Sequence, residues 1–183
     1  LILLAGLPLV MALPMSAAEP SLTHVHPPGV ARGRETEVRL VGKFDPWPCH
    51  VWAEAPGVRF QAGKEAGVFT VVVAAEAAPG PCLIRAFNAE GGSAPIALVI
   101  ADSVQSAEIE PNNDFRAPQV LNESTVTING RHEKPDDIDS FAVSLTPGQV
   151  LVARVEAYVL AAGYDAMLRV VDETGMVLAF NHD

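Results

Sequence analysis

The sequence predicts an all-β protein built from two consecutive β-sandwich domains, and two observations lead to this fold class. Short segments that are rich in β-branched residues, or that alternate apolar with polar side chains, recur along the chain. Turn signals such as Pro56-Gly57 and Gly91-Gly92 separate them at roughly ten-residue spacing. The second observation is charge: fourteen acids and five bases follow Ile100, against eight acids and seven bases up to that residue. We therefore expect two units that differ in charge.

The composition excludes one class of partner. The chain has 183 residues, of which 49% are hydrophobic and 19% charged, and its net charge is −10. Nucleic acid is excluded because phosphate binding needs clustered Lys and Arg, which the sequence lacks. The acidity of the second half has two interpretations that stay open, the solubility of an exported protein and the binding of cations.

Residues 1–18 form an apolar segment that is interrupted by Pro8 and Pro14 and ends in small residues. It is too short and too interrupted to span a bilayer, and it is typical of the apolar part of a secretory signal peptide. A buried β-strand is the alternative, although two prolines would interrupt its hydrogen bonding. We expect a mature chain that begins at Glu19, has no membrane span, and is secreted, periplasmic or at the cell surface. Because no positively charged segment and no initiating Met precede Leu1, we expect the sequence to be truncated at its start.

Cys49 and Cys82 are the two cysteines of the sequence. In an oxidising compartment, such a pair predicts a disulfide rather than a metal or catalytic site. The bridge would contribute about 3.5–4 kcal/mol to stability in the chain-entropy description. The alternative is two unbonded, buried thiols in neighbouring strands.

The first domain is expected over residues 19–101 as an immunoglobulin-like β-sandwich. Its opening, with Pro27-Pro28-Gly29, then Arg32-Gly33 and a strand that ends at Gly42, resembles immunoglobulin-like modules of the IPT/TIG type. The resemblance covers mainly residues 20–45 and implies a fold without any chemistry. Besides the opening strand, strands are expected at 37–41, 50–53, 68–74, 83–87 and 94–100.

Two residue sets in the first domain raise binding hypotheses. His24 and His26 alternate on the first strand, where they would either present two imidazoles to zinc or lie exposed on an edge strand. An aromatic set would either form a flat sugar-binding surface or belong to the core. That set consists of Phe44, Trp47, Trp52 and Phe60.

The second domain is expected over residues 108–183, after a polar linker at 102–107. In the segment 150–157 apolar residues occupy both faces, as in a strand buried on both sides. Thr146-Pro147-Gly148 and Glu173-Thr174-Gly175 mark turns between the later strands. The expected strands are 125–130, 140–145, 150–157, 166–171 and 176–180.

Two oxygen-rich clusters mark the entrance to the second domain. Glu108 and Glu110 point to one side of an extended segment, about 7 Å apart, because side chains repeat every two residues. Pro111 then favours a bend in which Asn112 and Asn113 supply amide oxygens. The second cluster, just before the strand at 140–145, consists of Asp136, Asp137 and Asp139.

Together the two clusters predict one calcium site. Ca²⁺ prefers six to eight hard oxygen ligands from carboxylates, amides and carbonyls, which these residues supply. Magnesium would require a stricter octahedral geometry, and zinc prefers His or Cys, which the clusters lack. The alternative is an acidic linker between domains that is exposed to water.

The second half also carries a series of spaced motifs, which in order are Glu108-x-Glu110-Pro111-Asn112-Asn113, Gly130, Asp137-x-Asp139-x-Phe141, Gly148-Gln149, Asp165, Asp172-x-x-Gly175 and Asn181-x-Asp183. This order resembles the bacterial pre-peptidase C-terminal domain. The resemblance implies a jelly-roll-like, non-catalytic domain of secreted proteins, in which some members bind calcium and some bind collagen or polysaccharide. The chain departs from the family at His182, where another Asp is common, and ends before the family's last strands. The calcium ligands that the resemblance implies are Glu108, Glu110, Asn112, Asp137 and Asp139, with Asn113 as a further candidate.

No catalytic signature is present in the sequence: there is no nucleophile elbow, no H-E-x-x-H, no phosphate-binding loop and no dinucleotide fingerprint. We therefore expect no enzymatic activity. The expected function is that of a secreted binding or spacer fragment, stabilised by calcium, that recognises extracellular protein or polysaccharide. The alternative is an accessory region of a secreted hydrolase, a peptidase, whose catalytic domain lies outside this chain.

Overall fold

The structure is a computed structural model that describes residues 18–132, 134–135, 137–163 and 165–182. The predicted signal peptide, apart from Ala18, lies outside the described residues, and so do Asp136 and Asp183. The described residues form fourteen β-strands and no helix, which confirms the predicted all-β fold class. None of them forms an apolar helix of membrane-spanning length.

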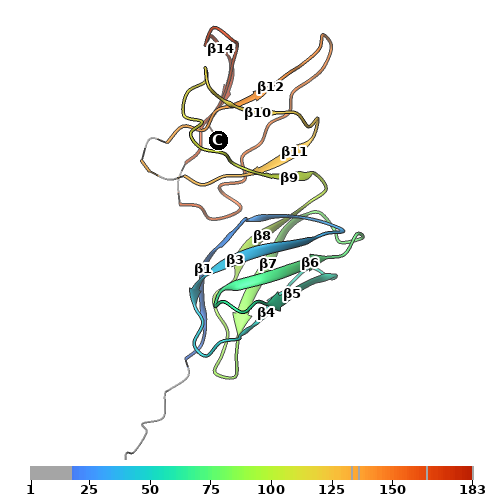
Figure 1. The fold of residues 1–183 in the computed structure, drawn as a ribbon, viewed down its shortest axis with the longest axis vertical. Helices are drawn as coiled ribbons and strands as arrows, with labels where there is room; N and C mark the ends of the chain where they lie inside the picture. Colours follow the sequence, from blue (N-terminus) through green and yellow to red (C-terminus); the bar gives the residue numbers. More distant parts are fainter. Residues whose placement is uncertain (1–17, 133, 136, 164, 183) are drawn as a thin grey trace, which may run out of the picture.

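The first eight strands form a sandwich of two four-stranded sheets (Figure 1). One sheet has the order β1-β3-β6-β5, and the other has the order β2-β8-β7-β4. Within the second sheet β2 pairs with β8 in parallel, whereas the other neighbours in both sheets are antiparallel. The strands are β1 (Ser21–His26), β2 (Gly29–Ala31), β3 (Glu35–Lys43), β4 (His50–Ala53), β5 (Val58–Ala62), β6 (Val68–Val73), β7 (Gly80–Phe87) and β8 (Ile96–Ala101).

Alternating side chains build the core of this sandwich. In β6 every second residue, namely Phe69, Val71 and Val73, is buried, and β7 repeats the alternation. Because successive side chains of a strand point to opposite faces, the inner faces of the two sheets cover each other. Burial of each large apolar side chain contributes about 1.5–3 kcal/mol. The immunoglobulin-like sandwich expected for the first domain is thus confirmed in its architecture.

Three of the four aromatic residues proposed as a sugar-binding surface pack against this core. Trp47 contacts Phe69 edge-on, with 5.2 Å between the ring centroids, and Phe60 contacts the same ring at 6.0 Å. Phe44 packs in turn against Trp47. Of the four, Trp52 alone is widely exposed, at 51%. Of the two interpretations of this set, the core interpretation therefore holds for three of its members.

The predicted disulfide between Cys49 and Cys82 is also wrong. Both cysteines are buried free thiols, and burial raises the pKa of each. The register of β4 and β7 pairs His50 with Phe87 and Ala53 with Ile84, so the two cysteines lie at opposite ends of this strand pair. Continued by one residue, this register sets Cys49 opposite Asn88. That position is about six residues, or about 20 Å, from Cys82 along the direction of β7. A disulfide requires Cα atoms within about 7 Å of each other.

This arrangement predicts that a reducing agent leaves the thermal stability of the protein unchanged. No bond is available for reduction, and both thiols are shielded until the protein unfolds. Calorimetry with and without dithiothreitol, together with alkylation after unfolding, provides the measurement, and both cysteines should be labelled without prior reduction. A melting temperature that falls on reduction would contradict the register of β4 with β7.

The second unit consists of three two-stranded sheets (Figure 1). Two of the pairs, β9 with β11 and β10 with β12, are parallel, and β13 pairs with β14 in antiparallel orientation. The strands are β9 (Val104–Ala107), β10 (Gln119–Leu121), β11 (Val126–Asn129), β12 (Phe141–Val143), β13 (Leu168–Val171) and β14 (Val177–Asn181).

Two expectations about the second unit are corrected. Most of the expected linker at 102–107 is the strand β9, because its backbone pairs with β11. The segment 150–157 forms no strand, and Val150 and Val152 are 83% and 85% exposed. Apolar side chains on both faces favour a strand only where a neighbouring strand completes the hydrogen bonding, and the described residues supply none at this segment.

A buried asparagine connects the two units. Asn129, at the end of β11, accepts a hydrogen bond from the Gly29 backbone N–H at 2.8 Å and donates one to Gln105 Oε1 at 3.0 Å. Gly29 permits this approach, because a Cβ atom there would lie 2.7 Å from both Asn129 Oδ1 and Gln105 Oε1. The first sandwich is thus hydrogen-bonded to the β9–β11 sheet, which leads directly into the acidic cluster.

Candidate metal centre

Three carboxylates that are distant in sequence converge at the start of the second unit. Glu108, Glu110 and Asp139 each offer an oxygen atom, and these oxygens lie within 4.8 Å of one another. Among the described residues, one group of three or more His, Cys, Asp or Glu side chains is close enough to share a metal ion, and it consists of these three. The predicted meeting of the two acidic clusters is therefore observed.

Backbone hydrogen bonds hold the two segments together. The Ser140 N–H donates to the Asn112 carbonyl at 2.9 Å, and the Gln119 N–H donates to the Ser140 carbonyl at 3.0 Å. The second bond adjoins the pairing of β10 with β12, whose register begins at Gln119 opposite Phe141. Because Asp139 immediately precedes this joint, the strand pairing brings it to the loop that carries Glu110.

Glu108 is fixed by three hydrogen bonds. Its backbone N–H donates to the Asn129 carbonyl at 3.2 Å. Its carboxylate accepts from the Arg131 N–H at 2.8 Å and from Asn112 Nδ2 at 3.1 Å. Gly130 allows this approach, since a Cβ atom at that position would lie 2.9 Å from Glu108 Oε2. The side chain is thus positioned before any ligand binds.

The turn after Glu110 folds back onto its carboxylate. Glu110 Oε2 accepts from the Asn112 backbone N–H at 2.9 Å and from Asn113 Nδ2 at 3.2 Å. This local bonding follows from the run of Asn residues after Pro111, a composition that favours turns. Asn113 therefore positions Glu110 through its amide nitrogen.

Asn112 contributes a buried oxygen that lacks a partner. The residue is 1% exposed, and Oδ1 accepts no hydrogen bond from any described residue. A buried acceptor of this kind costs about 1–3 kcal/mol unless a partner is supplied. Because Nδ2 of the same amide contacts Glu108, the oxygen lies beside the carboxylate cluster. A cation at the cluster would be a suitable partner for it.

The electrostatics of the cluster favour the loss of negative charge. The pKa of Asp139 is raised to about 6, first because neighbouring atoms shield it from water and then because Glu108, Asp137 and Glu110 lie close. The side chain of Asp137 is 1% exposed and lies 3.8 Å from Lys134 Nζ. Four acidic side chains thus repel one another here, and a bound cation would relieve that repulsion.

Of the six predicted ligands, the structure brings Glu108, Glu110 and Asp139 into one cluster. Asn112 and Asn113 are hydrogen-bonded to its carboxylates, and Asp137 is near enough to perturb Asp139. The hydrogen bond from the Arg131 backbone N–H to Glu108 could not be predicted, because every residue other than proline carries the same main-chain donor. Calcium binding itself stays a prediction.

The histidine pair does not belong to this cluster. His24 and His26 are on β1, which is an edge strand, as one of the two interpretations expected. His24 Nδ1 is 3.2 Å from Thr23 Oγ1. Burial, the positive charge of Arg131 and then His24 lower the pKa of His26. In the described part of the chain, neither histidine belongs to a group of metal-ligating side chains.

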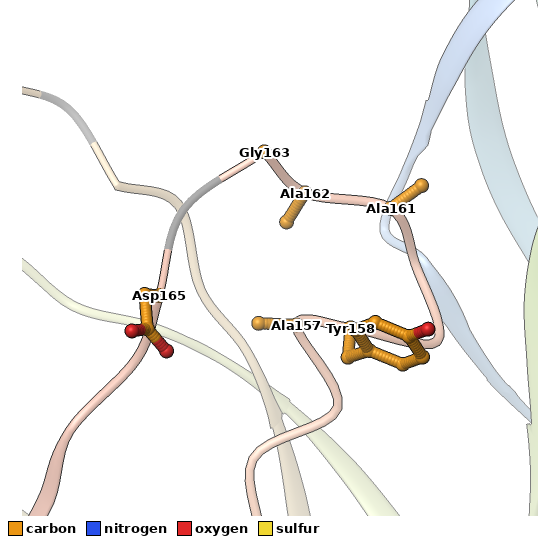
Figure 2. A pocket seen from close by; sticks show the side chains of 6 residues that line it. All are labelled: Ala157, Tyr158, Ala161, Ala162, Gly163 and Asp165. Carbon is orange, nitrogen blue, oxygen red and sulfur yellow. The ribbon is translucent and has the colours of Figure 1, made fainter. Parts of the chain in front are cut away.

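Figure 2 shows an open hollow in the loop that follows the exposed segment 150–157. Asp165 lies on one arm of this loop and Tyr158 on the other, and the remaining lining residues have small side chains without titratable groups. Tyr158 is 96% exposed. Among the described residues of this lining there is no paired nucleophile and base of the kind that covalent catalysis uses. The lining residues are Ala157, Tyr158, Ala161, Ala162, Gly163 and Asp165.

Comparisons with known proteins add little to this geometry. No protein-family model matches the chain, and no curated protein does. A solved structure described as "Structure of Titin M4 trigonal form" is 20% identical, with a TM-score of 0.31. The similarity covers 47% of this chain and 97% of the titin chain. It is too slight to bear on function.

Proposed function

We propose that this chain is a non-catalytic part of an exported protein, in which a calcium ion stabilises the second unit at its junction with the first. The Asn112 amide oxygen carries this proposal, because it is buried beside the carboxylate cluster and no described residue donates a hydrogen bond to it. The role that fits such a molecule is the recognition or spacing of extracellular protein or polysaccharide.

The residues present fit calcium in kind. Glu108, Glu110 and Asp139 each offer one carboxylate oxygen within 4.8 Å of the others, and the Asn112 amide has a further oxygen. Calcium accepts six to eight such ligands in flexible geometry. The cluster contains no His or Cys, which zinc would favour. Calcium would therefore supply charge neutralisation and cross-linking of two chain segments.

Cross-linking at this position would act on the whole second unit. The cluster joins the end of β9 to the segment before β12, and each of these strands belongs to a sheet of two strands. Two-stranded sheets are marginally stable by themselves. An ion that binds only the folded form shifts the equilibrium toward that form. The free energy of ion binding therefore adds to the free energy of unfolding.

We infer further that the second unit is a domain of the pre-peptidase C-terminal type. The order of acidic and glycine motifs supports this assignment, and the convergence of Glu108, Glu110 and Asp139 agrees with the ligand set that the resemblance implies. Gly130, a member of that motif series, provides the space in which Glu108 lies.

Calcium is expected to raise the melting temperature of the full chain by about 5–10 °C at a concentration 100 times the dissociation constant. Calorimetry in millimolar calcium and in chelator measures this shift. Glu108→Gln should reduce it strongly, whereas Glu123→Gln, at an exposed acid of the same unit, should leave it unchanged. Identical melting curves with and without chelator would reject the calcium site.

A further inference from the structure

An aromatic and cationic face covers the outer side of the sheet that contains β4 and β7. The outward residues of β4 are His50 and Trp52, and the outward residues of β7 include Leu83, Arg85 and Phe87. The register sets His50 opposite Phe87 and Trp52 opposite Arg85. We refer to these five residues as the β4–β7 face. In Figure 1, β4 lies on the side of the first sandwich away from the second unit.

Large apolar side chains are exposed together on the β4–β7 face. Trp52 is 51% exposed, and Leu83 and Phe87 are each 41% exposed. The His50 ring lies over Phe87 with 5.3 Å between the centroids and 31° between the planes. The pairs His50–Phe87 and Trp52–Arg85 are about 7 Å apart along the strands, because they are two residues apart. Several aromatic and apolar side chains exposed on the same sheet face are typical of an interaction site.

Hydrogen-bond donors without partners accompany the aromatic rings. The Arg85 guanidinium has five N–H donors and the Trp52 indole has one, and no described residue forms a hydrogen bond or ion pair with either group. Glu54, the nearest acid in the strand register, accepts a hydrogen bond from the Leu83 backbone at 3.4 Å. The complementary ligand is therefore negatively charged, rich in acceptors and flat.

We infer that the β4–β7 face binds an acidic polysaccharide. A uronate carboxylate matches the fork of Arg85 donors, and the apolar face of a sugar ring matches the Trp52 and Phe87 rings. An extended acidic peptide would instead pair with the main-chain groups of β4, the edge strand of this sheet, and would not use the outward side chains of both β4 and β7. The first 100 residues carry eight acids and seven bases, so an acidic polymer meets little repulsion there. This inference names the ligand class of the proposed recognition role and rests on it for the extracellular location.

Affinity electrophoresis of the full chain provides the test, with gels that contain hyaluronan, dextran or poly-L-glutamate. Hyaluronan should retard the protein, and Arg85→Gln or Trp52→Ala should each weaken binding about tenfold, the effect of losing a charge-assisted bond or an aromatic contact. Arg59→Gln provides the matched control, because Arg59 is exposed on β5 in the other sheet. It should leave the retardation unchanged. Circular dichroism verifies that each variant keeps its strands.

Three results would each overturn the inference: no retardation by hyaluronan, equal retardation by dextran, or equal retardation by poly-L-glutamate. An effect of Arg59→Gln as large as that of Arg85→Gln would also overturn it, because binding would then follow net charge. The same gels are run in calcium and in chelator. Retardation that persists in chelator separates this inference from the calcium proposal, since the β4–β7 face lies in the other unit.

Discussion

Asp139→Asn is expected to raise the melting temperature of the calcium-free protein and to remove its response to calcium. Without an ion, Asp139 is held among Glu108, Glu110 and Asp137, and the raised pKa reports the unfavourable charge. An asparagine keeps the shape and removes the repulsion. Its amide also donates to Glu108, with which Asp139 lies within hydrogen-bonding distance. We expect a rise of roughly 2–4 °C, the effect of about 1 kcal/mol in a chain of this length.

The same substitution removes one of the three clustered carboxylates, so calcium affinity should fall steeply. The variant should therefore melt at a higher temperature than wild type in chelator and at a lower temperature than wild type in calcium. A merely structural role of Asp139 would not reverse the order of the two proteins in this way. Calorimetry in both buffers measures it. Glu123→Gln, an exposed acid outside the cluster, provides the control and should show neither effect. A variant that is less stable than wild type in both buffers would contradict the account.

The first sandwich could be predicted from the sequence because its signals are local. In β6 and β7 buried and exposed positions alternate, and β6 is rich in β-branched residues, so each strand can be predicted from its own segment. The acidic cluster could be predicted for a related reason. Glu108 and Glu110 are two residues apart in an extended segment, and a loop rich in Asn follows them. Only their meeting with Asp139 required a contact between distant segments.

The predictions that were wrong depended on how strands pair and on where side chains point, and residue type does not encode either. The two cysteines are both buried, but the register of β4 with β7 places them at opposite ends of the strand pair, too far apart for a disulfide. The segment at 104–107 looks polar and yet forms β9, because β11 supplies its hydrogen-bond partners. Trp47 and Trp52 are the same residue type, so residue type alone does not predict that Trp52 is the exposed one. The direction in which the backbone points each side chain determines its exposure.

Asn129→Ala is expected to cost about 2–6 kcal/mol and to loosen the connection between the two units. Removal of the amide leaves the buried Gly29 N–H without its acceptor and Gln105 Oε1 without its donor, at about 1–3 kcal/mol for each unmet group. Urea unfolding measures the free energy, and protease sensitivity at 102–103, between β8 and β9, reports the loosened connection.

The exposed Asn122 provides the matched control, since Asn122→Ala should change stability by less than about 0.5 kcal/mol. A second substitution separates the hydrogen bond from general damage. Gly29→Ala places a Cβ atom 2.7 Å from both Asn129 Oδ1 and Gln105 Oε1, so only the part of its cost that is due to Asn129 should disappear when Asn129 is already Ala. Additive costs in this double-mutant cycle would mean that the two residues do not form the connection. The calcium response should survive Asn129→Ala, because the Glu108 N–H donates to the Asn129 backbone carbonyl and not to the side chain.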